Sequence, residues 1–196
     1  ADQSAQTLET VAEALLTLKQ EAGVLTKENV LAAERALMCY HDAAKAYRLH
    51  LVSHAHIDMD WRWGFEETVG IVIDTFQTML KLLDEYPSFI YSQSQASVYE
   101  IVEKYAPELL DPICKYVREG RWEVLASTWV EADKNMSGTE AMARHILYTK
   151  KYLSRLLGID PDSMQVDFEP DTFGHSSNVP EILRQGGVRY YYHCRG

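Results

Sequence analysis

From residue 47 onwards, short apolar segments alternate with longer amphipathic ones. Five segments of strand length are predicted as strands, at residues 48–52, 89–92, 122–126, 164–168 and 188–192. Between them, apolar residues recur at helical spacing over 66–85 and from Ser137 to Gly158, and Ser97 with Glu100 predicts a capping box at another helix start. Strands separated by helices pair in parallel, because parallel neighbours need a crossover connection. The alternation therefore predicts an α/β fold with a parallel sheet.

Two architectures satisfy this alternation, an open doubly wound sheet and a closed barrel. No GxGxxG or GxxxxGK follows a predicted strand, so the usual signal for nucleotide binding is missing. His and Asp residues follow several different strands, as in barrel enzymes. We predict a parallel, barrel-like β/α domain over 47–196, part of a seven-stranded β/α barrel. This catalytic domain is predicted to be incomplete at its C-terminus, because the sequence ends with the fifth strand.

The first part of the chain has a different pattern. Apolar residues recur at helical spacing over 7–22, and Thr26 is a suitable N-cap for a second helix. Neither helix carries a recognisable catalytic motif. We predict a short helical lead-in segment over 1–46.

The acidic composition limits the partners of the chain. The net charge of −10 and the isoelectric point near 5.1 disfavour nucleic acid and anionic membranes. There is no run of 18 apolar residues, and the N-terminus does not resemble a signal peptide. Scattered cysteines without a CxxC pair favour a reducing compartment. We expect a cytoplasmic protein without nucleic-acid or membrane partners, and we leave a homo-oligomer open.

The densest chemical motif follows the first predicted strand. His54, His56, Asp58 and Asp60 alternate along it, and residues two apart in an extended segment point the same way. Zinc accepts imidazole nitrogen and carboxylate oxygen at similar short distances. A single such residue is usually an ordinary surface group. Four in alternation, followed by the aromatic Trp61, predict a site for a divalent metal.

A second motif follows the fourth predicted strand. Asp171 comes after Glu169 and a proline, which keeps the residue before it extended, so Asp171 is expected at the carboxyl end of the strand. The simpler role for Asp171 is to cap the short helix that follows, but Asn178 is better placed for that. We predict a functional carboxylate at Asp171 and leave the role of His175 open.

These motifs closely resemble the signatures of the zinc-dependent α-mannosidases of glycoside hydrolase family 38. The likeness rests on His56–Trp61 and Pro170–Ser176, and on Trp129–Asp133 with Ser137–Glu140, which is similar to the W-V-E-x-D…S-G-E stretch of the family's cytosolic and bacterial branch. It covers the chain from about residue 47 to the end, in the family's order and with fitting spacing. One departure is Met59-Asp60, where many relatives carry proline-glycine or small apolar pairs, so the orientation of Asp60 stays open.

The resemblance implies roles for individual residues. The implied zinc ligands are His56, Asp58 and Asp171. Asp171 is also implied to be the nucleophile of a retaining glycosidase, with the acid/base residue and one more histidine ligand beyond residue 196. The implied substrate-binding residues are Trp61, Phe173 and Arg195. Glu131 and Asp133 are further candidates for the site.

Three functions are compatible with these residues. The first is a zinc-dependent retaining α-mannosidase that uses an aspartate nucleophile to remove terminal α-linked mannose from glycans or oligosaccharides. The second is another metal-dependent hydrolase, such as a deacetylase that uses His54 and His56 as an H-x-H pair with a metal-bound water. The third is a carbohydrate-binding remnant without turnover. We expect further sequence of the same enzyme after residue 196, and little turnover by this segment alone.

Overall fold

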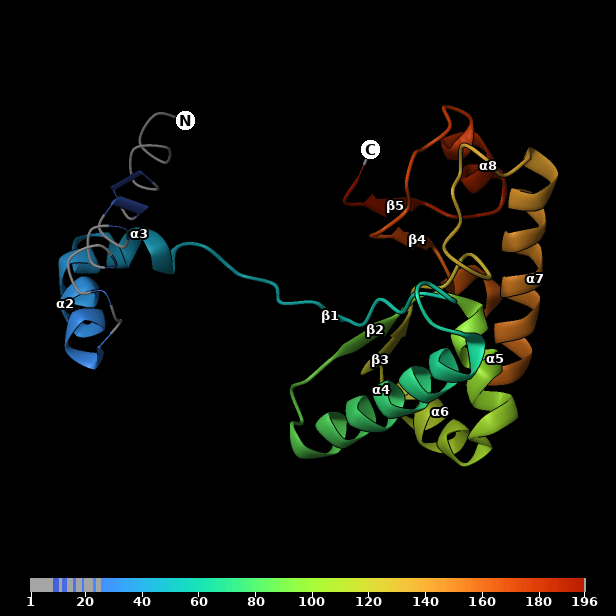
Figure 1. Cartoon of the computed structure of the whole chain (residues 1–196), viewed down its shortest axis with the longest axis horizontal. Coiled ribbons are helices and arrows are strands. Elements are labelled where there is room, and N and C mark those ends of the chain that lie inside the picture. The colour runs from blue at the N-terminus through green and yellow to red at the C-terminus, as the bar shows by residue number, and fades with distance from the viewer. Residues whose placement is uncertain are drawn as a thin grey trace. The chain divides into compact units, whose positions relative to one another are not determined.

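The computed structural model describes residues 26–195, together with residues 9, 10, 12, 13, 16, 19 and 23. The chain divides into two compact units, Ala1–Leu51 and Val52–Gly196. Figure 1 shows the first unit in blue and the second in colours that run from teal to red. Among the described residues, no helix combines the length and apolar character needed to cross a membrane.

The first unit is helical in its described part. Helix α2 (Lys27–Leu37) begins at the predicted cap, where the hydroxyl oxygen of Thr26 accepts a hydrogen bond from the Asn29 amide at 3.2 Å. The 3-10 turn η1 (Met38–Tyr40) and the short helix α3 (His41–Lys45) follow. The helix predicted over 7–22 falls largely outside the described residues.

The second unit is built on parallel strands. The three-stranded sheet has the order β1 (Ser53–His54), β2 (Tyr91–Gln93), β3 (Trp122–Val124), and the two-stranded sheet pairs β4 (Val166–Glu169) with β5 (Tyr190–His193). The predicted parallel α/β class is confirmed. The described residues contain these five strands in two sheets, so the seven-stranded barrel is not confirmed.

The first strand begins later than predicted. Residues 48–52 are not a strand, and β1 consists of Ser53–His54. Because Ser53 lies opposite Tyr91, the residues before Ser53 would have to pair with the segment before Tyr91, and there the chain turns, with the Phe89 amide bonded to the Tyr86 carbonyl at 3.0 Å. Residues 48–52 therefore find no extended segment of β2 to pair with, although they are largely apolar.

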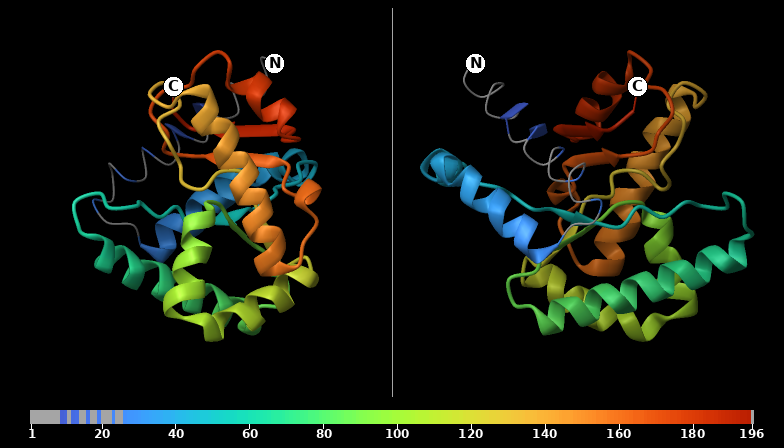
Figure 2. Two further views of the ribbon diagram at one scale, coloured as in Figure 1. Left: turned by 90° about the vertical axis from the view of Figure 1, so that its right-hand side faces the viewer. Right: turned by 60° about the vertical axis from the view of Figure 1, so that its left-hand side comes forward.

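Helices connect the strands of the second unit. They are α4 (Phe65–Glu85), α5 (Ala96–Tyr105), α6 (Leu110–Arg118), α7 (Thr139–Leu157) and α8 (Val179–Gln185), with 3-10 turns η2 (Pro107–Leu109) and η3 (Pro161–Ser163). Helix α4 packs against α5 and α6, and α7 contacts α5, α6 and α8. Figure 2 shows α7 as a long helix that runs from this group towards α8. Helix α7 ends as predicted at Gly158, whose φ of 66° is left-handed.

The start of helix α5 differs from the prediction. Ser97 is not its cap; the helix follows Gln95, and the amides of Ala96 and Ser97 donate to the carbonyls of Thr128 and Trp129 at 3.1 and 2.9 Å. These carbonyls satisfy the helix N–H groups that a serine side chain would otherwise cap. The predicted capping box is therefore wrong, because a distant loop supplies the acceptors.

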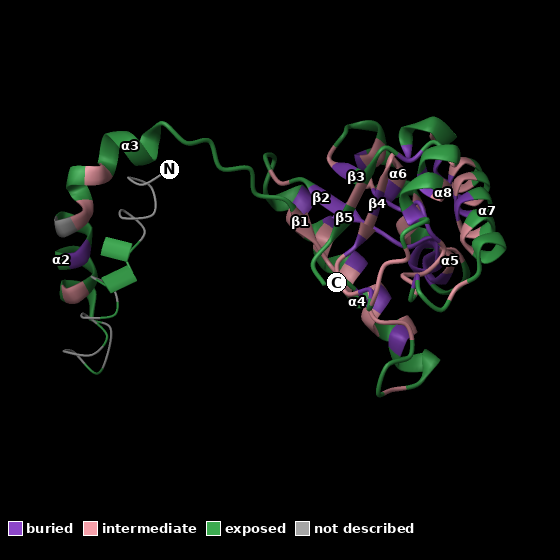
Figure 3. Cartoon of the chain, turned by 90° about the horizontal axis from the view of Figure 1, so that it is seen from above, coloured by how far each residue is buried: buried purple, intermediate pink, exposed green. Residues whose placement is uncertain are grey.

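An aromatic core holds the three-stranded sheet against the helices. Trp122 on β3, Tyr91 on β2, Tyr99 on α5 and Phe76 on α4 are almost fully buried. The ring of Trp122 lies 4.7 Å from that of Tyr91 and 5.1 Å from that of Phe76, and its Nε1 donates to the Tyr99 hydroxyl at 3.0 Å. Figure 3 shows buried residues along β2 and on the helices around it. This core fixes where the loops after the strands leave the sheet.

Candidate active site

The two predicted motifs meet at the carboxyl ends of β1 and β4. His56 Nε2 lies 2.9 Å from Asp58 Oδ1 and 3.9 Å from Asp171 Oδ2. Within the part of the chain that the structure describes, these three residues are the group whose ligand atoms all lie within 4.8 Å of one another. The structure thus brings together the three residues predicted as metal ligands, although their role as ligands stays a prediction.

The donor atoms fit a zinc ion. Zinc binds imidazole nitrogen and carboxylate oxygen at about 2.0–2.2 Å, so two donors of a tetrahedral site lie roughly 3.3 Å apart. The separations of 2.9 and 3.9 Å lie on either side of that value. Nε2 of His56 faces both carboxylates, while Nδ1 lies 2.9 Å from Glu131 Oε2. Contact with Glu131, and to a smaller extent with Asp58, raises the pKa of His56.

The candidate ligands line a cleft of about 720 Å³. Trp61 and Phe173 lie in its walls with 63% and 62% of their surfaces exposed. The guanidinium of Arg195 lies over the Phe173 ring, 4.6 Å from its centroid, and pairs with Oδ1 of Asp171. Exposed aromatic faces beside a few convergent polar groups are typical of a small-molecule site. Trp61, Phe173 and Arg195 therefore share one cleft with Asp171.

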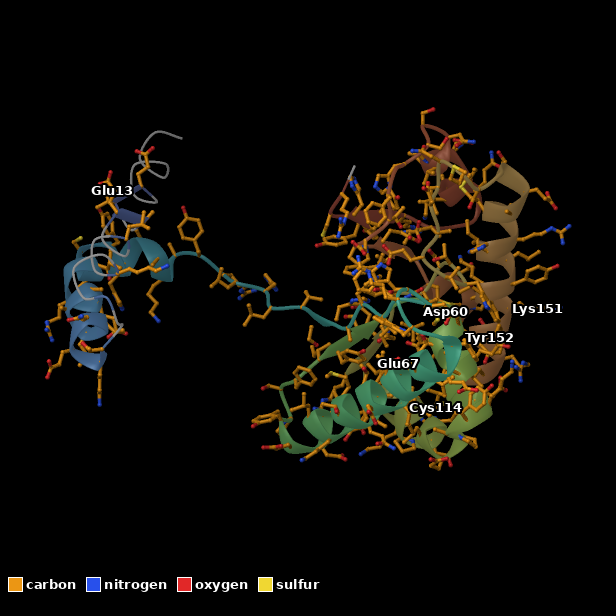
Figure 4. The ribbon with its side chains drawn as sticks, in the orientation of Figure 1. Glu13, Asp60, Glu67, Cys114, Lys151 and Tyr152 are labelled. Carbon is orange, nitrogen blue, oxygen red and sulfur yellow. The ribbon has the colours of Figure 1, made fainter. Side chains whose placement is uncertain are left out.

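Asp60 lies in the loop that leads into α4 (Figure 4) and lines the same cleft. Its carboxylate is nevertheless directed to Thr68, whose hydroxyl lies 3.5 Å from Oδ1 and accepts a hydrogen bond from the Asp60 amide at 3.4 Å. With φ at 56°, the backbone of Asp60 is no longer extended. This contact explains why Asp60 does not join the group formed by His56 and Asp58.

His54 points away from His56. Its Nε2 lies 2.9 Å from the Ser94 hydroxyl, and its ring packs against Phe168 with a centroid distance of 4.4 Å. Burial lowers the pKa of His54 to about 4, and the neighbouring His56 contributes. The predicted alternation of His54, His56, Asp58 and Asp60 on one face is wrong, because β1 ends at His54 and the chain after it is no longer a regular strand.

His175, whose role the sequence left open, supports Arg195. Its Nδ1 accepts a hydrogen bond from the Tyr191 hydroxyl, and its Nε2 donates to the Arg195 carbonyl. His193 Nδ1 lies 3.0 Å from the same carbonyl. The histidine of the second motif thus holds the backbone of the arginine that pairs with Asp171.

The sequence reasoning missed Gln95. This residue follows β2, is 3% exposed and lines the cleft. Its side-chain amide joins two loops, since Nε2 donates to the Ile57 carbonyl at 2.9 Å and Oε1 accepts from the Glu131 amide at 3.0 Å. The only signal in the sequence was its place three residues after the end of a predicted strand.

A buried charged cluster adjoins the site, and the sequence did not reveal it. Lys134 is 3% exposed and its Nζ contacts Asp167 and, at 3.2 Å, Glu169, which are both fully buried on β4. The Thr172 hydroxyl lies 2.6 Å from Glu169 and 3.1 Å from Glu131, which connects the cluster to the cleft. Burial, together with the neighbouring Asp167, raises the pKa of Glu169 to about 8.

We expect the raised pKa of Glu169 to make stability depend on pH. The carboxyl group binds a proton below about pH 8 in the folded chain, but only below about 4.5 when unfolded. Between these values the folded state binds more protons, so the free energy of unfolding should fall as pH rises. Glu169→Gln should reduce this slope, measured by urea unfolding across the window with a chelator present.

The surface variant Glu85→Gln is the control and should keep the slope of the wild-type chain. An identical slope in Glu169→Gln would show that Glu169 does not titrate in this window.

The fold and the site define a class of protein. Parallel strands whose carboxyl ends carry convergent carboxylates and a histidine, beside an aromatic-lined cleft, are typical of a hydrolytic enzyme built on an α/β scaffold. The family model "Glycosyl hydrolases family 38 N-terminal domain" matches residues 46–195. The chain belongs to glycoside hydrolase family 38, as the sequence motifs predicted.

Curated relatives agree with this membership. The chain is 32% identical over 159 residues to Alpha-mannosidase G of Dictyostelium discoideum, and 34% identical over 152 residues to Alpha-mannosidase 2C1 of Homo sapiens. These matches cover 81% and 77% of the chain but 14% of each relative, so the chain spans about one seventh of the length of these proteins.

Two solved structures share the fold. The crystal structure of an alpha-mannosidase from Enterococcus faecalis V583 matches with a TM-score of 0.65 and 22% identity, over 72% of this chain and 16% of that one. A 4-alpha-glucanotransferase from Thermococcus litoralis matches with a TM-score of 0.55 and 20% identity, over 71% and 21%. At these identities the likeness concerns the fold alone.

Proposed function

We propose that this chain is the N-terminal part of the catalytic region of a zinc-dependent retaining α-mannosidase. Its substrate is proposed to be terminal α-linked mannose on glycans or oligosaccharides, the class of sugar that the names of the relatives suggest. The observation that carries this proposal is the convergence of His56, Asp58 and Asp171 from two distant segments of the chain. A neutral sugar also suits a chain with a net charge of −10.

Asp171 is the proposed nucleophile. Its two oxygens have different neighbours, since Oδ1 pairs with Arg195 and Oδ2 faces His56. In a retaining glycosidase one carboxylate attacks the anomeric carbon while a second carboxyl group, roughly 5–5.5 Å away, protonates the leaving oxygen. We propose that this second group is supplied by sequence after residue 196.

The other residues of the cleft bind and orient the sugar. His56, Asp58 and Asp171 would hold zinc, which as a Lewis acid would polarise oxygen atoms of the substrate. Trp61 and Phe173 would present apolar faces to the sugar ring. Arg195, held over Phe173, would keep the Asp171 carboxylate in its place beside the ring.

The alternatives have less support. A deacetylase with an H-x-H pair would need His54 beside His56, but His54 lies against Ser94 and Phe168. A carbohydrate-binding remnant would use the same contacts as the enzyme and would differ from it only in lacking turnover. The cytoplasmic location and the seven-stranded barrel remain predictions from the sequence.

Metal analysis tests this proposal. A chain stripped with a chelator and dialysed against zinc should retain about one zinc ion, since its three donors leave a position for further ligands. His56→Ala should lose this zinc. His50→Ala, the same change at an exposed histidine outside the cleft, should retain it. Equal zinc content in the wild-type chain and His56→Ala would contradict the site.

Hydrolysis of an aryl α-mannoside tests the activity itself. We expect little turnover by this segment and measurable turnover by a longer form of the protein that supplies the acid/base group. A longer form that binds zinc and sugar but hydrolyses nothing would favour the carbohydrate-binding remnant.

A further inference from the structure

The Glu131 side chain contacts both motifs that line the cleft. Its Oε2 lies 2.9 Å from Nδ1 of His56 in the first motif. Its Oε1 accepts the backbone N–H of Asp171 and, at 3.1 Å, the hydroxyl of Thr172 in the second motif. The Glu131 side chain is 7% exposed, so water competes little for these contacts. One buried carboxylate therefore joins the loop after β1 to the loop after β4.

Gln95 in turn fixes the backbone of Glu131. Its Oε1 accepts the Glu131 amide, while its Nε2 donates to the carbonyl of Ile57, the residue between His56 and Asp58. Gln95 has φ at 65°, a left-handed conformation that is unusual for a residue other than glycine. Such conformations persist where surrounding contacts specify them, and they occur often at functional sites.

We propose that Glu131 is a positioning residue of the metal centre and that Gln95 anchors it. This inference rests on the proposed function. Because the Glu131 carboxylate lies against the Nδ1 side of His56, Nε2 is the ring nitrogen that faces Asp58 and Asp171. Because Glu131 also holds the N–H of Asp171, the same carboxylate fixes the backbone from which the proposed nucleophile projects.

Glu131 acts through its neighbours. Among the described residues, the group of converging ligand atoms consists of His56, Asp58 and Asp171, and Glu131 is not part of it. Its carboxylate faces the ring nitrogen of His56 that points away from that group. Partners of this kind set the orientation of a ligand, and their loss usually weakens metal binding by about 10- to 100-fold.

The first test is zinc affinity, measured by competition with a chelating dye. Glu131→Ala should weaken zinc binding by about 10- to 100-fold. Glu131→Gln keeps the shape and one oxygen acceptor, so it should recover part of the loss. Glu103→Gln is the matched control, because Glu103 is a half-buried carboxylate on α5 that contacts Tyr152 and Arg155 instead of the site. It should bind zinc like the wild-type chain.

The second test is the NMR signal of the Asp171 amide in the metal-free chain. An N–H that donates to a carboxylate forms a charge-assisted bond, so the signal should lie downfield in the wild-type chain. It should move upfield in Glu131→Ala and Glu131→Gln, and also in Gln95→Ala, but not in Glu103→Gln. Glu131→Gln, which is isosteric, decides the result if Glu131→Ala does not fold.

The outcomes separate this inference from the proposed function. If the wild-type chain binds zinc and both Glu131 variants bind it equally well, the positioning role is overturned while the metal centre stands. If the wild-type chain binds no zinc, the proposed metal centre fails. The Asp171 amide signal then decides alone. A shift in the Glu131 variants supports the contact by which Glu131 joins the two loops, and an unchanged signal overturns it.

Discussion

Asp171→Asn is expected to abolish hydrolysis of an aryl α-mannoside by the longest active form of the protein. Removing the nucleophile of a covalent mechanism lowers kcat by about 10⁴-fold or more. The amide is neutral and weakly nucleophilic, so it can neither form the glycosyl-enzyme nor pair as an anion with Arg195. The measurement is kcat for the variant and the wild-type protein, with zinc content determined for both.

The control for this prediction is Asp74→Asn, the same change at an exposed position on α4, which should leave kcat unchanged. A mechanism-based sugar reagent should label Asp171 in the wild-type protein. If Asp171→Asn kept its activity within tenfold of the wild type, the assignment of Asp171 as nucleophile would be wrong. Activity without labelling of Asp171 would favour a metal-dependent hydrolase that forms no covalent intermediate.

Lys134→Met should destabilise the fold by about 3–5 kcal/mol, the usual cost of removing one partner from a buried charged group. Lys134 is the cation in contact with Asp167 and Glu169, which are both fully buried. Methionine fills a similar volume but leaves the buried Asp167 carboxylate without its cation. Urea unfolding followed by tryptophan fluorescence, which reports on the buried Trp122, gives the change in the free energy of unfolding.

Two further variants test the cause. Lys104→Met removes an exposed lysine that pairs with Glu100 on α5, and it should leave the urea midpoint unchanged. Adding Asp167→Asn to Lys134→Met should restore part of the lost stability, because the buried carboxylate that lost its cation is then replaced by a neutral amide. A midpoint for Lys134→Met equal to that of the wild-type chain would show that the cluster contributes nothing to stability.

Much of the fold was predictable because its signals are local. Thr26 caps α2, Gly158 ends α7, and the helix over 66–85 appears as α4, because caps, left-handed glycines and apolar spacing act within a few residues. The start of β1 was not predictable in this way. It depends on where β2 begins, and that is set by the turn at Tyr86–Phe89.

In the candidate site, too, local signals were predictable and long-range contacts were not. The sequence pointed to two short motifs by residue types suited to a metal, and its resemblance to the family implied His56, Asp58 and Asp171 within them. It also grouped His54 and Asp60 with them, since alternation assumes a strand that continues, whereas β1 ends at His54. Once the chain leaves the strand, the contacts of each side chain decide which way it points.

The sequence by itself thus determined the parallel α/β class, the two motif loops and the residues that would carry the chemistry. Only the tertiary structure decided how these loops meet. The contacts of Glu131 with both motifs, the bridge made by Gln95 and the buried pairing of Lys134 all join residues more than thirty positions apart. Such contacts leave no periodic trace in a sequence, because they arise from the way the strands and helices pack.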